Sequence, residues 1–387
     1  MLAITIAGGA VSAEPFFQPR NIFPLVGKHT HGSSIVECPN GDLLACWFHG
    51  SGERTADDVV VNGARLKKGA SEWSPMFLMA DTPGFPDCNP ALYVDRHERV
   101  WLFWIAVQAH RWECCLLKYR RADSCGDAGP PDWTWQDVIM LKPGEVFASD
   151  LEAKFEELGV GEGMWGEYAP PYAWMLIDAA QDPYKRQTGW MTRIHPYTLP
   201  SGRILLPLYS DGFNVSLVAL SDDDGDTWRA SRPIVGLGPT QPTFVRKKDG
   251  TIVAYLRDSG APPNRVQISL SQDDGESWSA SVDTDIPNPD SSLEVVALKD
   301  GRWLMVCNDT EEGRRRLTAL MSDDEGATWK WRSQIEPCDD IGQSFGYPSV
   351  IQARDGLIHM TYSYTSSQGN CIRHTVINPE WIEHSQP

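Results

Sequence analysis

The sequence is poor in positive charge and in long apolar segments. It has 34 Lys and Arg residues against 52 Asp and Glu residues, which gives a formal net charge of -18. This shortage of positive charge argues against a nucleic-acid-binding protein, because phosphate contacts require a basic face. No segment approaches the roughly 20 apolar residues that a membrane-spanning helix needs. We therefore expect neither a nucleic-acid partner nor a membrane span.

The motifs of several common enzyme classes are also missing. The sequence contains no nucleotide-binding glycine loop, no zinc-type ligand spacing, no Gly-x-Ser-x-Gly elbow and no Cys-x-x-Cys pair, which removes the enzyme classes that depend on them. We expect no cofactor and no metal. The nine cysteines are an odd number, so at least one thiol is free or intermolecular, and no full disulfide framework follows.

The first residues resemble part of a secretory signal. MLAITIAGGAVSAEP contains an apolar run that closes on the small residues Val11-Ser12-Ala13, although the usual positively charged start is missing. We interpret residues 1–13 as a signal-peptide remnant and expect a secreted or periplasmic protein.

A turn followed by an apolar run recurs six times along the chain, and a further short strand precedes most copies. The six runs are NGDLLACWF from Asn40, DRHERVWLFW from Asp95, SGRILLPLY from Ser201, DGTIVAYL from Asp249, DGRWLMVC from Asp300 and DGLIHMTY from Asp355. Each unit has the strand content of one four-stranded antiparallel sheet, and such sheets are stable when they are arranged radially. The sequence therefore predicts an all-β fold, a six-bladed β-propeller that spans residues 20–380.

The second and third units are separated by about twice the usual spacing. We expect an insertion over residues 125–190, with a hidden seventh blade as the alternative. SDLEAKFEEL, residues 149–158, predicts a helix with Ser149 and Glu152 in capping-box positions. The GMWGEYAPPYAW segment, which begins at Gly163, is either a lid over the site or a loop that only packs against the propeller.

Three near-identical octapeptides, SDDDGDTW, SQDDGESW and SDDEGATW, begin at Ser221, Ser271 and Ser322. In each, the third residue can accept backbone hydrogen bonds, the glycine can take a positive φ, and the tryptophan can wedge between sheets. The twelve-residue spacing of an EF-hand calcium loop is absent. We therefore interpret these residues as structural: Asp223, Trp228, Asp273, Trp278, Asp324 and Trp329.

These octapeptides resemble Asp boxes, and with the six-unit layout the chain resembles the sialidase superfamily of β-propellers, in its bacterial BNR-repeat branch. The resemblance covers roughly residues 25–380. It implies the scaffold more firmly than the reaction, because related propellers include glycoside hydrolases, polysaccharide lyases and proteins without catalysis.

The propeller prediction brings the starts of inner strands and the ends of second strands together at one mouth of the central channel. The repeat register places polar side chains there. They are His31, Asn89, His195, Gln241, Glu294 and Tyr347 at the strand starts, with Arg257, Asn308 and Tyr364 at the strand ends; Arg193 is a further candidate for substrate binding.

The resemblance also implies roles for some of these residues. Sialidases clamp a carboxylate with three arginines; Arg257 matches the second, and Arg315 or Arg314 matches the third. His31 stands where the first arginine is expected, and an imidazole is suited to proton transfer. Tyr347 resembles the nucleophilic tyrosine.

Two carboxylates complete the expected site. Glu294 is the candidate that activates the Tyr347 phenol, which is a weak nucleophile unaided. The general acid is expected in the loop GSGERTADD, at Asp58 or Asp57.

Three functions are consistent with these residues. The first is an exo-acting glycoside hydrolase on an anionic or uronate-containing glycan, with His31, Tyr347, Glu294 and Asp58 as catalytic residues. The second is a polysaccharide lyase, in which a His/Tyr pair removes the proton α to a uronate carboxylate. The third is a glycan-binding propeller without catalysis. Each expects an oligosaccharide or polysaccharide partner, and the sequence does not indicate an oligomeric state.

Overall fold

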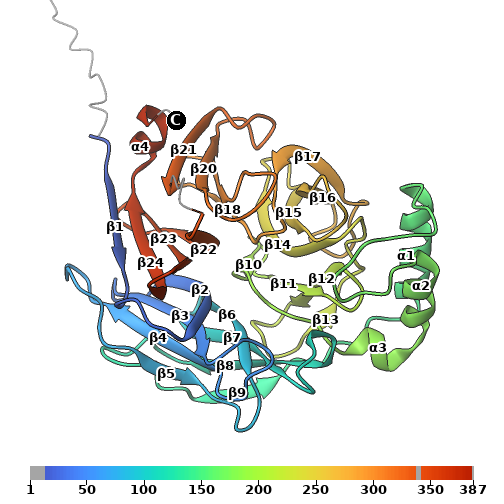
Figure 1. Cartoon of the computed structure of the whole chain (residues 1–387), viewed down its shortest axis with the longest axis horizontal. Helices are drawn as coiled ribbons and strands as arrows, with labels where there is room; N and C mark the ends of the chain where they lie inside the picture. Colours follow the sequence, from blue (N-terminus) through green and yellow to red (C-terminus); the bar gives the residue numbers. More distant parts are fainter. Residues whose placement is uncertain (1–13, 337–340, 386–387) are drawn as a thin grey trace, which may run out of the picture.

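Short runs of β-branched and aromatic residues, separated by Asp-Gly and Asn-Gly turns, form strands throughout the protein. The computed structural model describes residues 14–336 and 341–385. In these residues, six four-stranded antiparallel sheets surround a central axis (Figure 1). The six-bladed β-propeller predicted from the sequence is confirmed. The segment interpreted as a signal peptide, residues 1–13, lies outside the described residues.

Each sheet is one blade. In blades 1 to 5 the strands follow one another along the chain from the axis outward. Blade 1 contains β2 (His29–Glu37), β3 (Leu43–Gly50), β4 (Val60–Leu66) and β5 (Phe77–Ala80); blade 2 contains β6 (Asp87–Val94), β7 (Val100–Val107), β8 (Cys115–Ala122) and β9 (Trp135–Val138); blade 3 contains β10 (Tyr197–Thr198), β11 (Ile204–Ser210), β12 (Val215–Ser221) and β13 (Arg229–Ala230). Blade 4 contains β14 (Pro239–Arg246), β15 (Ile252–Asp258), β16 (Arg265–Ser271) and β17 (Val282–Pro287); blade 5 contains β18 (Glu294–Ala297), β19 (Trp303–Cys307), β20 (Leu317–Ser322) and β21 (Trp331–Glu336).

Blade 6 closes the ring with strands from both ends of the chain. It contains β22 (Ser344–Gln352), β23 (Ile358–Ser366) and β24 (Gly369–Ile377), and its outermost strand is β1 (Phe17–Asn21). β1 pairs antiparallel with β24, from Phe17 opposite Ile377 to Asn21 opposite Arg373. The inner strands of the first and last blades, β2 and β22, pack against each other. This pairing joins the two ends of the ring.

The expected insertion is helical and lies on one outer side of the propeller (Figure 1). It contains α1 (Val146–Glu157), α2 (Ala173–Gln181) and α3 (Pro183–Gln187), whereas α4 (Pro379–His384) follows the last strand. β9 of blade 2 falls within the expected range 125–190, so the helical part begins after that strand. The predicted cap at Ser149 is wrong, because α1 begins three residues earlier and the Ser149 hydroxyl donates to the Val146 carbonyl inside the helix.

The three octapeptides form identical turns between the third and fourth strands of blades 3, 4 and 5. In the first, Asp223 Oδ1 accepts from the Thr227 amide at 2.8 Å and from the Ser221 hydroxyl at 2.9 Å, while Ser221 Oγ accepts from the Gly225 amide at 2.8 Å. Asp273 and Asp324 make the same contacts. A Cβ on Gly225 would lie 2.4 Å from Trp101, so glycine is required where this turn meets blade 2.

The octapeptide tryptophans pack against side chains of neighbouring strands. Trp228 lies edge-on to Phe103 of blade 2, Trp329 packs on Tyr255 of blade 4, and Trp278 stacks on Phe244 with ring centroids 5.3 Å apart. These contacts support the structural interpretation of the repeat.

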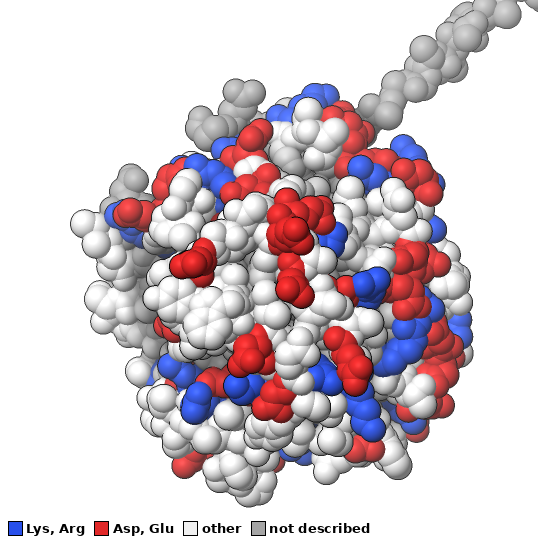
Figure 2. Space-filling view, turned by 90° about the vertical axis from the view of Figure 1, so that its right-hand side faces the viewer, with Lys and Arg blue, Asp and Glu red and all other residues white. Residues whose placement is uncertain are grey.

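Three further features concern the surface, the cysteines and the helices. Acidic and basic side chains are interspersed on the edge that carries the insertion (Figure 2). Cys38 and Cys125 form a disulfide between blades 1 and 2, with Cα atoms 5.9 Å apart. In the described part of the chain, no helix is both long and apolar enough to cross a membrane.

Replacement of a buried octapeptide tryptophan should destabilise the propeller. Trp278 is 5% exposed, so Trp278→Ala leaves a cavity beside Phe244 and is expected to lower the free energy of unfolding by about 3–5 kcal/mol. Urea titration of the full chain measures this. The control, Trp174→Ala, removes a tryptophan that is 61% exposed and should change the free energy by less than about 0.5 kcal/mol. Equal effects of the two substitutions would contradict the wedge interpretation.

Candidate active site at the channel mouth

The inner strands carry a repeated bulge at the mouth of the channel. Their pairing shifts register between Cys88 and Ala91, between Thr240 and Thr243, and between Gly346 and Ser349, with the same shift in β2 after His31. At each bulge one residue is left-handed: Gly32, Asn89, Gln241 and Tyr347 have φ between 51° and 63°. For residues other than glycine this conformation costs on the order of 1–3 kcal/mol. The bulges therefore aim selected side chains into the mouth at an energetic cost.

Tyr347 is at the centre of the mouth and is held by Arg257. Arg257 Nη1 donates to Tyr347 Oη at 2.8 Å, and Arg257 Nε donates to Asp290 Oδ1 at 2.6 Å. The Ser259 hydroxyl donates to the same Asp290 oxygen at 2.9 Å. Asp290 thus fixes the guanidinium, and the guanidinium fixes the phenol. Any negative charge that develops on Oη lies next to a cation.

His31 lies against the other side of Tyr347, across the seam between blades 1 and 6. The two ring centroids are 4.0 Å apart and the rings are tilted by 55°. Burial lowers the pKa of His31 well below its usual value of 6.5, and the positive charge of Arg314 lowers it further. His31 is therefore neutral near pH 7 and can accept a proton.

Two more arginines surround the same phenol ring. The Cζ atoms of Arg193 and Arg314 lie 5.0 and 5.1 Å from its centroid. Arg193 is fully buried, and its two Nη groups donate to the Ser33 and Pro348 carbonyls. It cannot grip a ligand directly but contributes positive charge beneath the ring.

The structure corrects the sequence-based choice of the third arginine. Arg314 donates to the Asp290 carbonyl at 2.7 Å and faces the mouth, whereas its neighbour Arg315 is exposed. Arg314 is also the residue whose Cζ lies close to the Tyr347 ring.

Glu294 is not in contact with Tyr347, contrary to the expected activating role. Its Oε1 lies 2.6 Å from His195 Nδ1, and its Oε2 accepts from the Val350 amide at 2.6 Å. His195 Nε2 lies 2.8 Å from the Ile35 carbonyl oxygen. Burial alone would lower the pKa of His195, but the Glu294 carboxylate outweighs burial and raises it. These two residues form an ion pair that links blades 1, 3, 5 and 6 inside the channel.

The two aspartates of the loop after β3 do not suit the expected role of general acid. Asp58 is exposed, and hydrogen bonds from the Ser51 hydroxyl and amide lower its pKa to about 2. Asp57 is exposed and contacts His110 at 2.7 Å. A carboxyl group that stays ionised is a poor proton donor near neutral pH. Asp58 therefore does not fit the role of general acid.

Two carboxyl groups that the sequence reasoning missed fit the acid role better. Burial raises the pKa of Asp211, which follows β11, to about 7, although the Arg257 charge acts in the opposite direction. Burial also raises the pKa of Glu53, and the charges of Arg54 and Arg314 partly offset this effect. Position could have identified Asp211, because it comes directly after β11, the second strand of blade 3, just as Arg257 lies at the end of β15, the second strand of blade 4.

The remaining candidates mostly join neighbouring blades. The side-chain amide of Asn89 donates to Tyr209 Oη at 3.0 Å. Asn308 is fully buried, and its side-chain amide donates to the Phe345 carbonyl at 2.9 Å. Tyr364 stacks on Phe345 with ring centroids 5.1 Å apart. Gln241 has a buried Oε1 that accepts no hydrogen bond within the described part of the chain. Of this group, Gln241 is best placed to contact a ligand.

The segment that precedes α2 reaches the mouth from the insertion. Arg54 of the loop after β3 has its Cζ atom 5.0 Å from the centroid of the Tyr168 ring. The Trp165 carbonyl accepts a hydrogen bond from the side-chain amide of Asn214 at 3.4 Å. Glu167 acts electrostatically on both Glu53 and Asp211. Residues 163–172 therefore form one wall of the mouth. Among the described residues, no group of three or more His, Cys, Asp or Glu side chains is arranged to hold a metal ion.

The raised pKa of Asp211 predicts a pH-dependent stability. Between its usual value of 3.8 and about 7, the unfolded chain loses a proton that the folded chain keeps, so stability falls as the pH rises through this range. Asp211→Asn should reduce that fall and be more stable than the wild type above pH 7, as measured by urea unfolding at a series of pH values. Asp58→Asn is the control, because the lowered pKa of Asp58 acts only below 3.8. An unchanged pH profile in Asp211→Asn would refute the raised pKa of Asp211.

Solved structures with the same fold include several sialidases. The Hadza microbial sialidase Hz136 is 16% identical with a TM-score of 0.66, over 91% of this chain and 66% of that one. The chain thus spans slightly less than two thirds of that protein. The intramolecular trans-sialidase from Ruminococcus gnavus is 14% identical with a TM-score of 0.66, over 95% of this chain and 98% of that one. A protein of unknown function from Dyadobacter fermentans is 16% identical with a TM-score of 0.64, over 93% and 99%.

Sequence comparison gives the family. No curated protein matches the chain. The BNR repeat-like domain matches residues 41–151 and 188–360, and the gap between the two matches contains most of the helical insertion. The matches cover well over half of the protein, so this chain belongs to the BNR repeat-like domain family.

Proposed function

We propose that this protein is a sialidase-like, exo-acting glycoside hydrolase on an anionic or uronate-containing glycan. The observation that carries the proposal is the position of Tyr347, whose hydroxyl accepts a hydrogen bond from Arg257 while its ring lies against the neutral His31. A phenol between a cation and a base is arranged as a nucleophile. The fold shared with structures named as sialidases supports this reading.

The charge of the mouth fits a carboxylate on the substrate. Arg257 and Arg314 flank Tyr347 in a chain of net charge -18, and arginine binds carboxylates through charge-assisted hydrogen bonds. Arg193 adds positive charge from below. The contact between Arg54 and Tyr168 closes one side of the mouth. This wall favours binding of the end of a glycan over binding of an internal glycan segment.

The available groups account for each proton in a two-step hydrolysis. In the first step Tyr347 Oη attacks the anomeric carbon, its proton passes to His31, and the leaving oxygen takes a proton from Asp211. In the second step water attacks the same carbon and gives a proton to the Asp211 carboxylate. The bond to Tyr347 then breaks, and His31 returns the proton to the phenol oxygen. The net reaction consumes one water molecule and restores all three residues.

A polysaccharide lyase is the second candidate, and the neutral state of His31 favours it. In this reaction His31 would take the proton α to a uronate carboxylate held by Arg257 and Arg314, and Tyr347 would protonate the leaving oxygen. The bond between C4 and the leaving oxygen breaks as the double bond forms, without added water. The product is an unsaturated sugar, which absorbs in the ultraviolet.

Incubation with a panel of sialosides, rhamnosyl-glucuronate oligosaccharides and uronate polysaccharides tests both reactions. We expect a product that has gained the mass of water, measured by mass spectrometry. His31→Ala and Tyr347→Phe should lower the rate by about 100-fold or more, whereas Tyr364→Phe, which removes the hydroxyl of a packed tyrosine, should not. Cleavage without added water would identify the lyase. Sugar binding without any product would identify the binding module and refute catalysis.

The two adjacent arginines provide a matched pair for substrate binding. Arg314→Ala should weaken binding of an anionic sugar by about 10- to 100-fold, because a charge-assisted hydrogen bond contributes about 1.5–3 kcal/mol. Arg315→Ala removes the same charge from an exposed position and should leave the affinity within about twofold. Isothermal titration with a product of the panel measures both. Equal losses would place the ligand away from Tyr347.

A further inference from the structure

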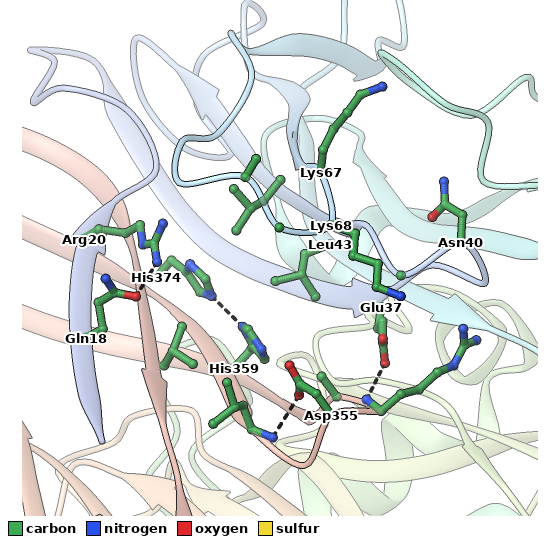
Figure 3. Close-up of a pocket in the computed structure, with 18 of the residues that line it drawn as sticks. Gln18, Arg20, Glu37, Asn40, Leu43, Lys67, Lys68, Asp355, His359 and His374 are labelled. Atoms are coloured by element: carbon green, nitrogen blue, oxygen red, sulfur yellow. Dashed lines mark hydrogen bonds between the residues drawn. The ribbon is translucent and has the colours of Figure 1, made fainter. Parts of the chain in front are cut away.

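A second polar pocket lies at the opposite end of the seam between blades 1 and 6. It has a volume of about 320 Å³ and is walled by β1, by the turns after β2 and β4, and by the turn between β22 and β23 (Figure 3). β2 runs from His31 at the mouth to Glu37 at this pocket. At about 3.3 Å per residue this is roughly 20 Å, so the pocket is separate from the candidate active site.

Positive charge predominates in this pocket although the protein is acidic. Its lining contains Arg20, Lys67, Lys68 and Arg354 but only two carboxylates, Glu37 and Asp355. Both carboxylates are partly engaged, since Glu37 accepts from the Arg354 amide at 2.8 Å and Asp355 accepts from the Leu357 amide at 3.0 Å. Lys68 extends over the pocket, whereas Lys67 points away from it (Figure 3).

A relay of three rings fixes a hydrogen-bond donor on the pocket wall. Trp73 Nε1, which can only donate, lies 3.3 Å from His374 Nδ1, so that nitrogen carries no proton. His374 Nε2 therefore carries the proton and donates to His359 Nδ1 at 3.0 Å. In the neutral His359 ring the remaining proton is on Nε2, which has no partner among the described residues. His359 thus presents an N–H donor at the pocket.

Burial keeps both rings of this relay neutral. It lowers the pKa of His359 to about 4 and that of His374 well below 6.5. Asp355 acts on His359 in the opposite direction, and Arg20 lowers the pKa of both rings. The orientation of the donor therefore does not change near neutral pH.

The turn that carries Lys68 is held by a buried ion pair. Asp42 Oδ1 accepts from the Lys68 amide at 2.9 Å, and Asp42 Oδ2 lies 3.5 Å from Arg65 Nη1. Arg65 is 2% exposed and donates to the Cys125 carbonyl at 2.5 Å. These contacts fix two walls of the pocket before any ligand arrives, which lowers the entropy lost on binding.

We propose that this pocket binds one oxyanion group, a sulfate, phosphate or carboxylate, through the Lys68 ammonium and the His359 Nε2–H group. Arg20 contributes positive charge from the opposite side of the pocket, where its Nη1 and Nη2 groups donate to the Ser71 carbonyl and to Gln18 (Figure 3). The group can belong to a free ion or to a substituent on a glycan, because the same donors and positive charge of the pocket would recognise either one.

Isothermal titration of the full chain with inorganic sulfate, inorganic phosphate and galactose 6-sulfate at constant chloride tests the site. We expect one equivalent to bind to the wild type and to Lys67→Ala with equal affinity. Lys68→Ala should bind about 10-fold more weakly or worse. His359→Leu, which removes the donor, should also lose binding, and His359→Gln, which keeps an N–H group near the Nε2 position, should retain it.

The outcomes separate cleanly. Binding of the inorganic ions and the sulfated sugar alike supports recognition of the group itself, and binding of the sugar alone supports a glycan source. No binding of any probe, or equal affinity in Lys68→Ala and Lys67→Ala, would overturn the proposal. Lys68 is exposed, so its substitution does not endanger folding, and thermal unfolding of each variant checks this.

Discussion

Closure of the ring is the constraint on which both ends of the channel depend. β1 and β24 come from opposite ends of the chain, and their pairing completes blade 6. That pairing holds β2 beside β22, which places His31 against Tyr347 at the mouth. The same seam forms the basic pocket at the far end. Stability and both candidate sites therefore depend on one set of strand contacts, and a change that opens the ring would remove all three together.

The mouth is built from strained backbone. Asn89, Gln241 and Tyr347 occupy the left-handed region at equivalent positions of three inner strands, a conformation that only a well-packed surrounding structure maintains. The large, rigid blades provide this surrounding. At these bulges the Tyr347 hydroxyl meets Arg257, and the Asn89 side chain donates to Tyr209 of blade 3.

Charge is distributed according to this geometry. Three arginines gather around one phenol in a protein of net charge -18. Burial, together with the charges of these arginines, lowers the pKa of His31 and keeps its ring neutral. Burial retains a proton on Asp211 in the same mouth. A neutral base and a protonated acid within one site are what acid–base chemistry on a glycan requires. The fold alone does not supply this arrangement, because related propellers differ in reaction.

The sequence determined the scaffold. The repeated octapeptides and the six turn-and-strand units specify blades because their hydrogen bonds and tryptophan contacts are local, and local signals can be read along the chain. It also indicated Tyr347, His31 and Arg257, whose positions follow from the repeat register. Proline follows each of the three left-handed residues Asn89, Gln241 and Tyr347, but a dipeptide does not reveal where its side chain points.

Only the tertiary structure decided which charges meet. It paired Glu294 with His195 rather than with Tyr347, chose Arg314 over Arg315, and raised the pKa of the half-buried Asp211 while Asp58 stayed exposed. These outcomes depend on burial and on distances between blades far apart in the sequence. Because a pKa depends on its whole surroundings, residue type and spacing determine the scaffold, whereas the assembled ring determines the chemistry.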